Sequence, residues 1–294
     1  MSIRCIGSII TAAAVLAAVP AFGQGRGGGY QPPEGPAPKL ADGHPDFSGL
    51  WQRPYTPDMS LNATDLDGKA YPLENPPAAN ANPPAANAGK NDAKGKQGGR
   101  GGRGGGPRKL PFTALGEKNW KGYSAEQGDY TGACLPFGLV RSMNSPDPIQ
   151  IMQSHDYLSL LYEQNTWFKV FQLDGHPHDK NATPTWFGDS VGHWEGDTLV
   201  VDTTNFNGRT RLDTIGHPHS DQLHVIEYFK RPDLGHISYT IIIDDPKAFT
   251  EKWKNERTFT LRTDWHIMEY SCEENNKSFW EGRIKIPNYD TWGK

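Results

Sequence analysis

The stretch HISYTIII at residues 236–243 decides the fold class of this chain. Ile237, Tyr239 and Ile241 alternate with the smaller polar residues Ser238 and Thr240, which is the pattern of a β-strand with one face toward a core. Similar short runs surround it, at residues 149–154, 157–163, 166–173, 198–203, 222–230, 256–262 and 265–272. No stretch with helical periodicity competes with them. This pattern predicts a mainly β chain, folded as an antiparallel β-barrel or, alternatively, as a β-sandwich.

Two local features refine this prediction. Glu195-Gly196-Asp197 directly precedes the run TLVVDT at 198–203, and its glycine suits the tight turn of a hairpin. Gly49-Leu50-Trp51 resembles the G-x-W that opens the first strand of lipocalin-like barrels. We therefore favour the barrel over the sandwich.

The chain is expected to have three parts. Arg4, the apolar run at residues 6–18 and the small residues Ala21 and Gly23 are typical of a signal peptide at residues 1–23. That run is shorter than the roughly 20 apolar residues of a membrane-spanning helix. Residues 24–45 read as a flexible tether. A single β domain is expected over 46–294, interrupted at about 62–109 by a disordered insertion rich in Pro, Ala and Gly. We expect a periplasmic or extracellular protein.

The cysteines support an oxidising compartment. Cys5 falls in the predicted signal peptide, which leaves Cys134 and Cys272. Two cysteines in an exported protein usually pair, so a disulfide is the favoured interpretation. Two free thiols, or a metal site that includes Cys134, are the alternatives.

The charge balance argues against two classes of partner. The chain has 30 basic and 34 acidic residues and a net charge of −4, which is too mild to indicate a nucleic-acid or membrane partner. The basic run at residues 90–109 lacks aromatic residues that could stack on bases. A small-molecule ligand is the expected partner, and the oligomeric state stays open.

Histidine is the most informative residue type. The tetrapeptide GHPH occurs at residues 175–178 and again at 216–219. Imidazoles can ligate metals or move protons, so His176, His178, His217 and His219 are candidate metal ligands. The alternative is that Gly-X-Pro simply forms turns in which the histidines are exposed to solvent. Because HxxxH and CxxC patterns are absent and the spacing to Glu227 does not match the H-x-H…E set of cupins, we predict no cofactor, with a transition metal as an alternative.

Several carboxylates share a strand face with apolar residues. In LHVIEYF at 223–229, alternation places Glu227 with Leu223 and Val225, and His224 on the opposite face. Glu163 and Glu269 stand in the same situation in their own runs. This predicts either a polar pocket inside the barrel or structural ion pairs with Arg141, Arg257 or Arg262.

From these residues we formulate one main hypothesis and two alternatives. A secreted barrel would bind a small, partly apolar molecule and act as a cofactor-free acid–base enzyme, a hydrolase or an isomerase. The proton-transfer pair would be His219 and Glu227, with His217, His224 and Asp221 orienting or polarising. Trp194, Arg141, Glu163, Glu269 and Trp186 would contact the ligand. The alternatives are a non-catalytic binding protein and, third, a histidine-ligated metalloenzyme.

Several longer stretches carry a family resemblance. They are DGHPDFSGLW at 42–51, CLP at 134–136, RSMNSP at 141–146, WEGDTLVVDT at 194–203, PHSDQLHVIE at 218–227 and DDP at 244–246. Together they resemble a family of exported bacterial β-rich proteins without an assigned activity. The resemblance implies export and a β-rich, lipocalin-like domain, and it implies no reaction and no catalytic residue.

Overall fold

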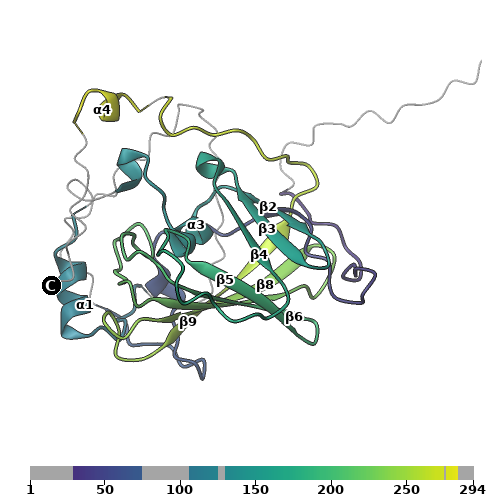
Figure 1. Cartoon of the computed structure of the whole chain (residues 1–294), viewed down its shortest axis with the longest axis horizontal. Helices are drawn as coiled ribbons and strands as arrows, with labels where there is room; N and C mark the ends of the chain where they lie inside the picture. The colour runs from purple at the N-terminus through teal and green to yellow at the C-terminus, as the bar shows by residue number, and fades with distance from the viewer. Residues whose placement is uncertain (1–28, 75–105, 125–129, 275, 284–294) are drawn as a thin grey trace, which may run out of the picture. The chain divides into compact units, whose positions relative to one another are not determined.

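The sheet is an antiparallel meander in which the first strand pairs with the last. The computed structural model describes residues 29–74, 106–124, 130–274 and 276–283 (Figure 1). The strands are β1 Gly49–Gln52, β2 Ile149–Gln153, β3 Tyr157–Tyr162, β4 Phe168–Gln172, β5 Asp189–Glu195, β6 Thr198–Thr204, β7 His224–Lys230, β8 His236–Asp244 and β9 Trp253–Leu261. They form one 9-stranded sheet in the order β4-β3-β2-β1-β9-β8-β7-β6-β5.

Pairing of β1 with both β2 and β9 leaves one break in the sheet, between β4 and β5. These two edges approach each other without forming a ladder, and just beyond β4 the Gly175 N–H donates to the Gly192 carbonyl at 3.0 Å. The result is a nearly closed antiparallel barrel, as predicted, and the sandwich alternative does not apply.

The core lies inside the barrel, because alternate side chains of each strand point inward. Ile237, Tyr239, Ile241 and Ile243 of β8 are all at most 1 % exposed. In β7 the same alternation buries Val225, Glu227 and Phe229. Glu227 therefore shares an inward face with Val225 and Phe229, and its direction, which the sequence left open, is toward the core.

Short helices accompany the barrel. They are the 3-10 helices η1 Met59–Asn62, η2 Tyr130–Ala133 and η3 Gln164–Thr166, and the α-helices α1 Ala114–Lys121, α3 Leu139–Asn144 and α4 Lys277–Trp280. Asp58 caps η1 through the Ser60 N–H, and Thr113 caps α1 through the Gly116 N–H. None of the described helices is long and apolar enough to cross a membrane.

The strand predicted at residues 265–272 is wrong. After β9 the chain leaves the sheet, because both sides of β9 are already paired, with β1 and with β8. Glu269 is consequently exposed, and Trp265 and Met268 are also exposed. Glu269 therefore does not share an inward face with Trp265, as the alternation had suggested.

The disulfide and part of the predicted flexible regions can be compared with the structure. Cys134 and Cys272 are bonded, with a separation of 138 residues along the chain. The ends of the predicted insertion take part in the fold, since Thr64 pairs with Lys254 and Leu73 with Arg108. Residues 75–105 of the insertion, and the predicted signal peptide, lie outside the described residues.

The predicted tether also begins to pack earlier than expected. Lys39 forms an ion pair with Asp197 of the β5–β6 turn at 3.1 Å, and Lys39 bridges to Pro45. Order on this side therefore extends from residue 46 back into the predicted tether.

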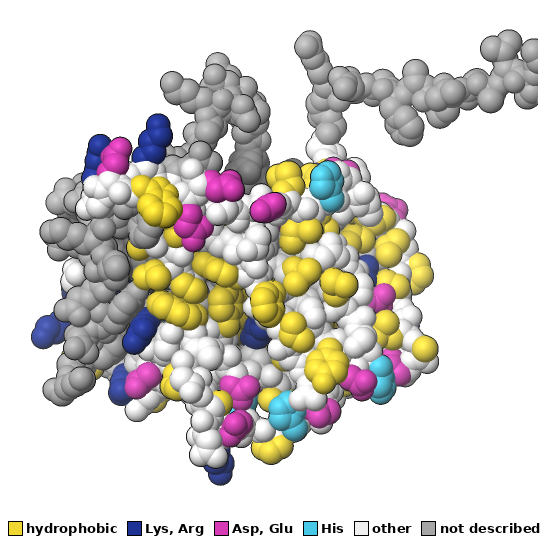
Figure 2. Space-filling model, turned by 45° about the horizontal axis from the view of Figure 1, so that its top comes forward, with side chains coloured by type: hydrophobic (Ala, Val, Ile, Leu, Met, Phe, Trp, Pro, Cys, Tyr) yellow, Lys and Arg dark blue, Asp and Glu magenta, His cyan; other side chains and the backbone are white. Residues whose placement is uncertain are grey.

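The outer face of the edge strand β4 is apolar. Phe168 and Val170 are 67 % and 53 % exposed, and Met152 of β2 and Tyr157 of β3 are exposed as well. Apolar side chains also gather on the face of the molecule that Figure 2 shows.

Gly192 should be required for closure of the barrel. A Cβ at this position in β5 would lie 2.7 Å from Leu173 Cδ2 and 3.2 Å from the Gln172 carbonyl oxygen. We expect Gly192→Val to reduce the free energy of unfolding by about 1–3 kcal/mol, as overpacking does, measured by urea denaturation. Gly106→Val is the control, because a Cβ there meets nothing within 4 Å. Equal stability of the two variants would contradict this role of Gly192.

Candidate functional site

A cluster of polar side chains lies inside the barrel beside the break in the sheet. Lys169 of β4 points inward with Phe171, while Phe168 and Val170 point outward. Its Nζ donates to Thr203 Oγ1 of β6 at 3.3 Å and lies 3.7 Å from Glu227 Oε2 of β7. Lys169 thus reaches across the break from one edge of the sheet to the interior strands.

Glu227 is the centre of this cluster. Its Oε1 accepts a hydrogen bond from the Tyr239 hydroxyl at 2.8 Å. Its Oε2 is buried and accepts no hydrogen bond from the described residues. One acceptor of a buried carboxylate is therefore available for a further donor.

Two cations share the interior with Glu227. Lys169 makes a single hydrogen bond, to Thr203, within the described chain. Arg257 of β9 donates through Nε to Asn255 at 2.9 Å and through one terminal nitrogen to the Met143 carbonyl at 3.2 Å. The second terminal nitrogen of Arg257 is buried and has no hydrogen-bond partner among the described residues. The interior thus contains a donor without a hydrogen-bond partner among the described residues, on Arg257, and an acceptor without one, Oε2 of Glu227.

Aromatic rings surround these groups with apolar surface. The Arg257 guanidinium carbon lies 5.7 Å from the Tyr239 ring centre, and Lys169 Nζ lies 5.5 Å from that of Phe171. Phe229 and Tyr239 meet edge to face at 5.0 Å. Apolar surroundings of this kind strengthen polar contacts and penalise isolated charges.

Burial changes the protonation of the cluster. It lowers the pKa of Lys169 from 10.5 to about 8, against the opposing effect of the Glu227 carboxylate. It lowers the pKa of Arg257 to about 10, and burial together with Glu227 raises the pKa of Tyr239 well above its ordinary value. Of these three groups, Lys169 has the pKa closest to neutral pH.

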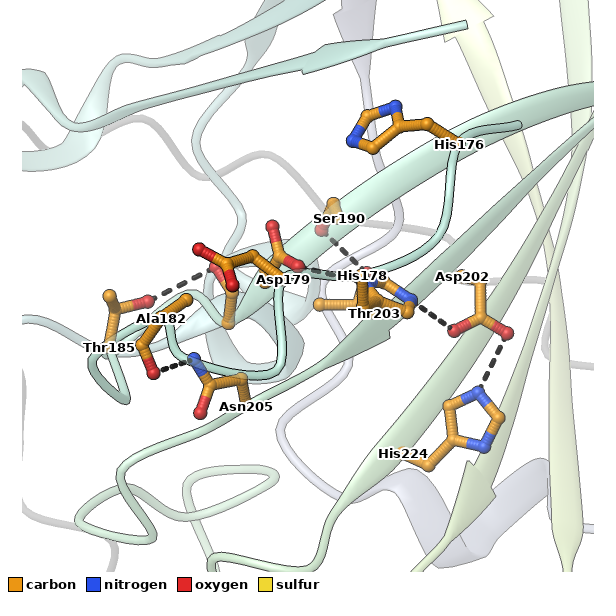
Figure 3. A network of polar contacts seen from close by, with 12 residues as sticks. His176, His178, Asp179, Ala182, Thr185, Ser190, Asp202, Thr203, Asn205 and His224 are labelled. Atoms are coloured by element: carbon orange, nitrogen blue, oxygen red, sulfur yellow. Dashed lines mark hydrogen bonds and ion pairs between the residues drawn. The ribbon is translucent and has the colours of Figure 1, made fainter. Parts of the chain in front are cut away.

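The opposite face of the same strands carries a second network (Figure 3). His178, from the β4–β5 connection, lies between two carboxylates: Nδ1 is 2.8 Å from Asp189 and Nε2 is 2.9 Å from Asp202. Asp202 also contacts His224 Nε2 at 2.8 Å. Two of the predicted residues, His178 and His224, are thus joined through Asp202, which the sequence interpretation missed.

The two networks are linked by strand alternation. Asp189 and Asp202 point outward from β5 and β6, whereas their neighbours Ser190 and Thr203 point inward and lie 2.7 Å apart through their hydroxyls. Thr203 in turn accepts the hydrogen bond of Lys169. The β5–β6 hairpin therefore supports the interior cluster on one face and holds the β4–β5 connection on the other.

The structure does not bring His219 and Glu227 together. His219 Nδ1 lies 2.9 Å from the Ser220 carbonyl and so carries the proton, which leaves Nε2 to accept from the Thr210 hydroxyl. Burial lowers the pKa of His219, so the ring is a neutral, fully hydrogen-bonded core residue. Glu227 has Tyr239 and Lys169 as partners instead.

The two GHPH copies also lie in different settings. His176 pairs with Asp174 at 2.6 Å and lies apart from His178 in Figure 3. His217 is buried and pairs with Asp213 at 2.5 Å. The four histidines therefore do not converge on one set of metal ligands.

The remaining predicted residues are scattered. Asp221 is exposed and pairs with Lys247 at 2.8 Å, and Glu163 accepts the Met268 N–H at 3.0 Å. Trp194 stacks on His44 at 4.2 Å, and Arg141 of α3 lies 5.3 Å from the Phe137 ring. Trp186 is half-buried in the connection before β5.

The sequence interpretation missed Lys169, Thr203, Tyr239 and Arg257 as site residues. Lys169 alternates with Phe171 in the run 166–173, so its inward direction could have been read from the period of two. Comparisons of the chain with protein-family models, with characterised proteins and with solved structures found no match.

The His178 network should stabilise the protein in a limited pH range. Burial opposes the charged forms, but the hydrogen bonds to Asp202 and Asp189 raise the pKa of His178, and those from His224 and His178 lower the pKa of Asp202. The contribution of His178 is then complete below its unfolded pKa of about 6.5 and disappears as pH rises through its folded pKa. That of Asp202 disappears only as pH falls through its lowered value.

We therefore expect His178→Gln to reduce the free energy of unfolding by about 1 kcal/mol at pH 5.5 and by clearly less at pH 8.5. Urea denaturation at both pH values measures this difference. His176→Gln is the control, because His176 contacts only Asp174 in its own turn. A pH-independent loss in His178→Gln would contradict the assignment.

Proposed function

We propose that this protein binds a small, partly apolar molecule inside the barrel, through Glu227, Lys169 and Arg257. The observation that supports this proposal is the buried Oε2 of Glu227, which accepts no hydrogen bond from the described residues. Leaving a buried polar atom without a partner costs about 1–3 kcal/mol, so such atoms commonly mark a place where another molecule donates.

The chemistry of the cluster defines the class of ligand. Glu227 offers an acceptor, whereas Lys169 and Arg257 offer donors with positive charge. A ligand that has both a hydroxyl group and a carboxylate or carbonyl oxygen matches this set. The rings of Phe171, Phe229 and Tyr239 favour an apolar or aromatic frame for the same molecule. Hydroxylated aromatic acids are therefore the class to test first.

Acid–base catalysis is the second candidate function, with Lys169 in the role that the sequence interpretation gave to His219. A pKa of about 8 lets Lys169 exchange a proton near neutral pH while Glu227 stays beside it at 3.7 Å. An enzyme would consume the bound molecule, whereas a binding protein would release it unchanged. Proton NMR of the ligand, incubated with the protein, distinguishes the two.

We also propose that the chain is exported and belongs with the β-rich exported proteins that its motifs resemble. The Cys134–Cys272 disulfide supports this proposal, because disulfides persist mainly in oxidising compartments. The apolar run after Arg4 supports it as well.

The ligand proposal can be tested with Glu227→Gln. The substitution keeps the size of the side chain and an oxygen that can accept from Tyr239, but it removes the charge beside Lys169. A panel of hydroxybenzoates and hydroxylated aliphatic acids is screened by thermal shift, and the strongest ligand is titrated calorimetrically. We expect Kd to rise at least about tenfold in Glu227→Gln, which corresponds to roughly 1.4 kcal/mol.

Glu256→Gln is the matched control, because Glu256 points outward from β9 and pairs with Lys254 at 3.1 Å. The double variant Lys169→Met/Glu227→Gln removes the charges of Lys169 and Glu227 together, so Lys169 is not left as a buried ammonium without its carboxylate. It should bind at least as weakly as Glu227→Gln. A ligand that binds all variants equally, or the absence of any ligand in the panel, would contradict the proposal.

A further inference from the structure

A second cluster of ionisable side chains is buried outside the interior cluster. Asp58 caps η1, and Asp213 and His217 lie in the long connection between β6 and β7. Their exposed fractions are 7 %, 0 % and 1 %. His217 belongs to the second GHPH copy, which the interior cluster does not use.

The three side chains point ligand atoms toward a common place. One nitrogen or oxygen from each lies within 4.8 Å of those from the other two. Atoms that share a divalent metal, at about 2.0–2.2 Å each, are typically a little over 3 Å apart. Coordination of an ion would therefore require these atoms to adjust, including a separation of Asp213 Oδ2 and His217 Nδ1, which lie 2.5 Å apart.

Hydrogen bonds hold the three side chains in position. Asp213 Oδ2 accepts from the Met59 N–H at 2.9 Å and contacts His217 Nδ1 at 2.5 Å. Asp58 Oδ1 accepts from the Ser60 N–H at 2.8 Å. Because Asp213 lies against Nδ1 of the ring, an ion shared by Asp213 and His217 would be bound through Nδ1 and not through Nε2 on the far side of the ring.

Among the described residues, no lysine or arginine forms an ion pair with Asp58 or Asp213. Within this part of the chain, Asp213 forms an ion pair only with His217, and Asp58 forms none. Glu74 is a third carboxylate that interacts electrostatically with the cluster. Burial has the largest effect on the pKa of its carboxyl and raises it, while His217 lowers this pKa and Asp58 raises it. Arg257 also faces Asp213 electrostatically, but its bonded partners are Asn255 and Met143. The rings of Trp120 and Phe112, at 5.1 and 5.9 Å from His217, cover the cluster.

We propose that Asp58, Asp213 and His217 bind a divalent transition metal such as Zn²⁺ or Mn²⁺. The imidazole favours these ions over Mg²⁺ and Ca²⁺, which prefer ligand sets made of oxygen alone. Glu74 is the candidate for a fourth ligand. The ion would fasten η1 to the β6–β7 connection, so its role is structural. The site and the proposed ligand site share no residue.

The test is a titration of metal-free full-length protein without an affinity tag. Zn²⁺ and Mn²⁺ are added separately after chelator treatment, and binding is measured by calorimetry and by thermal unfolding. We expect one ion per chain and a higher unfolding temperature of the metal-bound protein. Asp58→Asn keeps an acceptor for Ser60 but weakens the ligand set, so it should raise Kd at least about tenfold.

A spectroscopic readout locates the ion. Co²⁺ bound beside Trp120 should quench part of the tryptophan fluorescence and give a visible absorption spectrum. Trp120→Phe should remove that part of the quenching and keep the visible spectrum. The control is His178→Gln, which changes a partly exposed histidine of the outer network and should leave Kd unchanged.

Two outcomes would overturn the proposal. One is that the wild-type protein binds neither ion at millimolar concentration. The other is binding that persists unchanged in Asp58→Asn or that His178→Gln abolishes, which would indicate surface histidines. His217→Gln provides a second ligand variant, and Asp58→Asn decides the question if that variant does not fold.

Discussion

The hydrogen bond from Lys169 to Thr203 spans the one break in the sheet of this barrel. Every other neighbouring pair of strands is joined by a backbone ladder, whereas β4 and β5 are not. Lys169 extends from β4 past the edge of β5 to Thr203 of β6 and toward Glu227 of β7. The closeness of Gly192 to Leu173 and Gln172 keeps the two edges within reach of this side chain. Side-chain chemistry therefore replaces a ladder at one position of the sheet.

This solution has an energetic cost. The fall in the pKa of Lys169 from 10.5 to about 8 means that the charged ammonium lowers the free energy of unfolding by roughly 3 kcal/mol below pH 8, relative to the neutral amine. Glu227 recovers only part of the desolvation energy, and its Oε2 has no hydrogen bond from the described residues. A leucine and a methionine of similar volume would commonly close a barrel with equal or better stability. The energetic cost of the charged pair is consistent with the proposed role of the pair in recognition.

The strand pattern could be predicted from the sequence, because a single period of two governs which side chains are buried. The alternation in β8 correctly placed Tyr239 on the core face, and that in β7 correctly placed Glu227 on the same face as Val225 and Phe229. It failed at residues 265–272, where the composition suits a strand but β9 has no free side for it. Local pattern describes a strand's faces, whereas the number of available edges depends on the whole sheet.

The candidate site shows the same limit. Repetition of GHPH suggested that its histidines act together, yet His178 binds the outer face of the β5–β6 hairpin and His217 pairs with Asp213 in the protein interior. The two identical tetrapeptides have different neighbours. His178 lies between the strand carboxylates Asp189 and Asp202. His217 contacts the ring of Trp120 and Asp213, which accepts from the Met59 N–H of η1. His219 lost its proposed role because its two nitrogens are satisfied locally, by Thr210 and Ser220.

Lys169 was overlooked for the complementary reason. A lone lysine in a strand is normally a solvated residue, and only the alternation with Phe171 marks it as inward. Its functional interest arises from partners that lie 34 and 58 positions further along the chain, at Thr203 and Glu227. A buried amine becomes chemically distinctive when its counter-ion and its surroundings are assembled from separate strands. In this nearly closed sheet, the strand order brings Lys169, a residue with little local signal, beside Glu227.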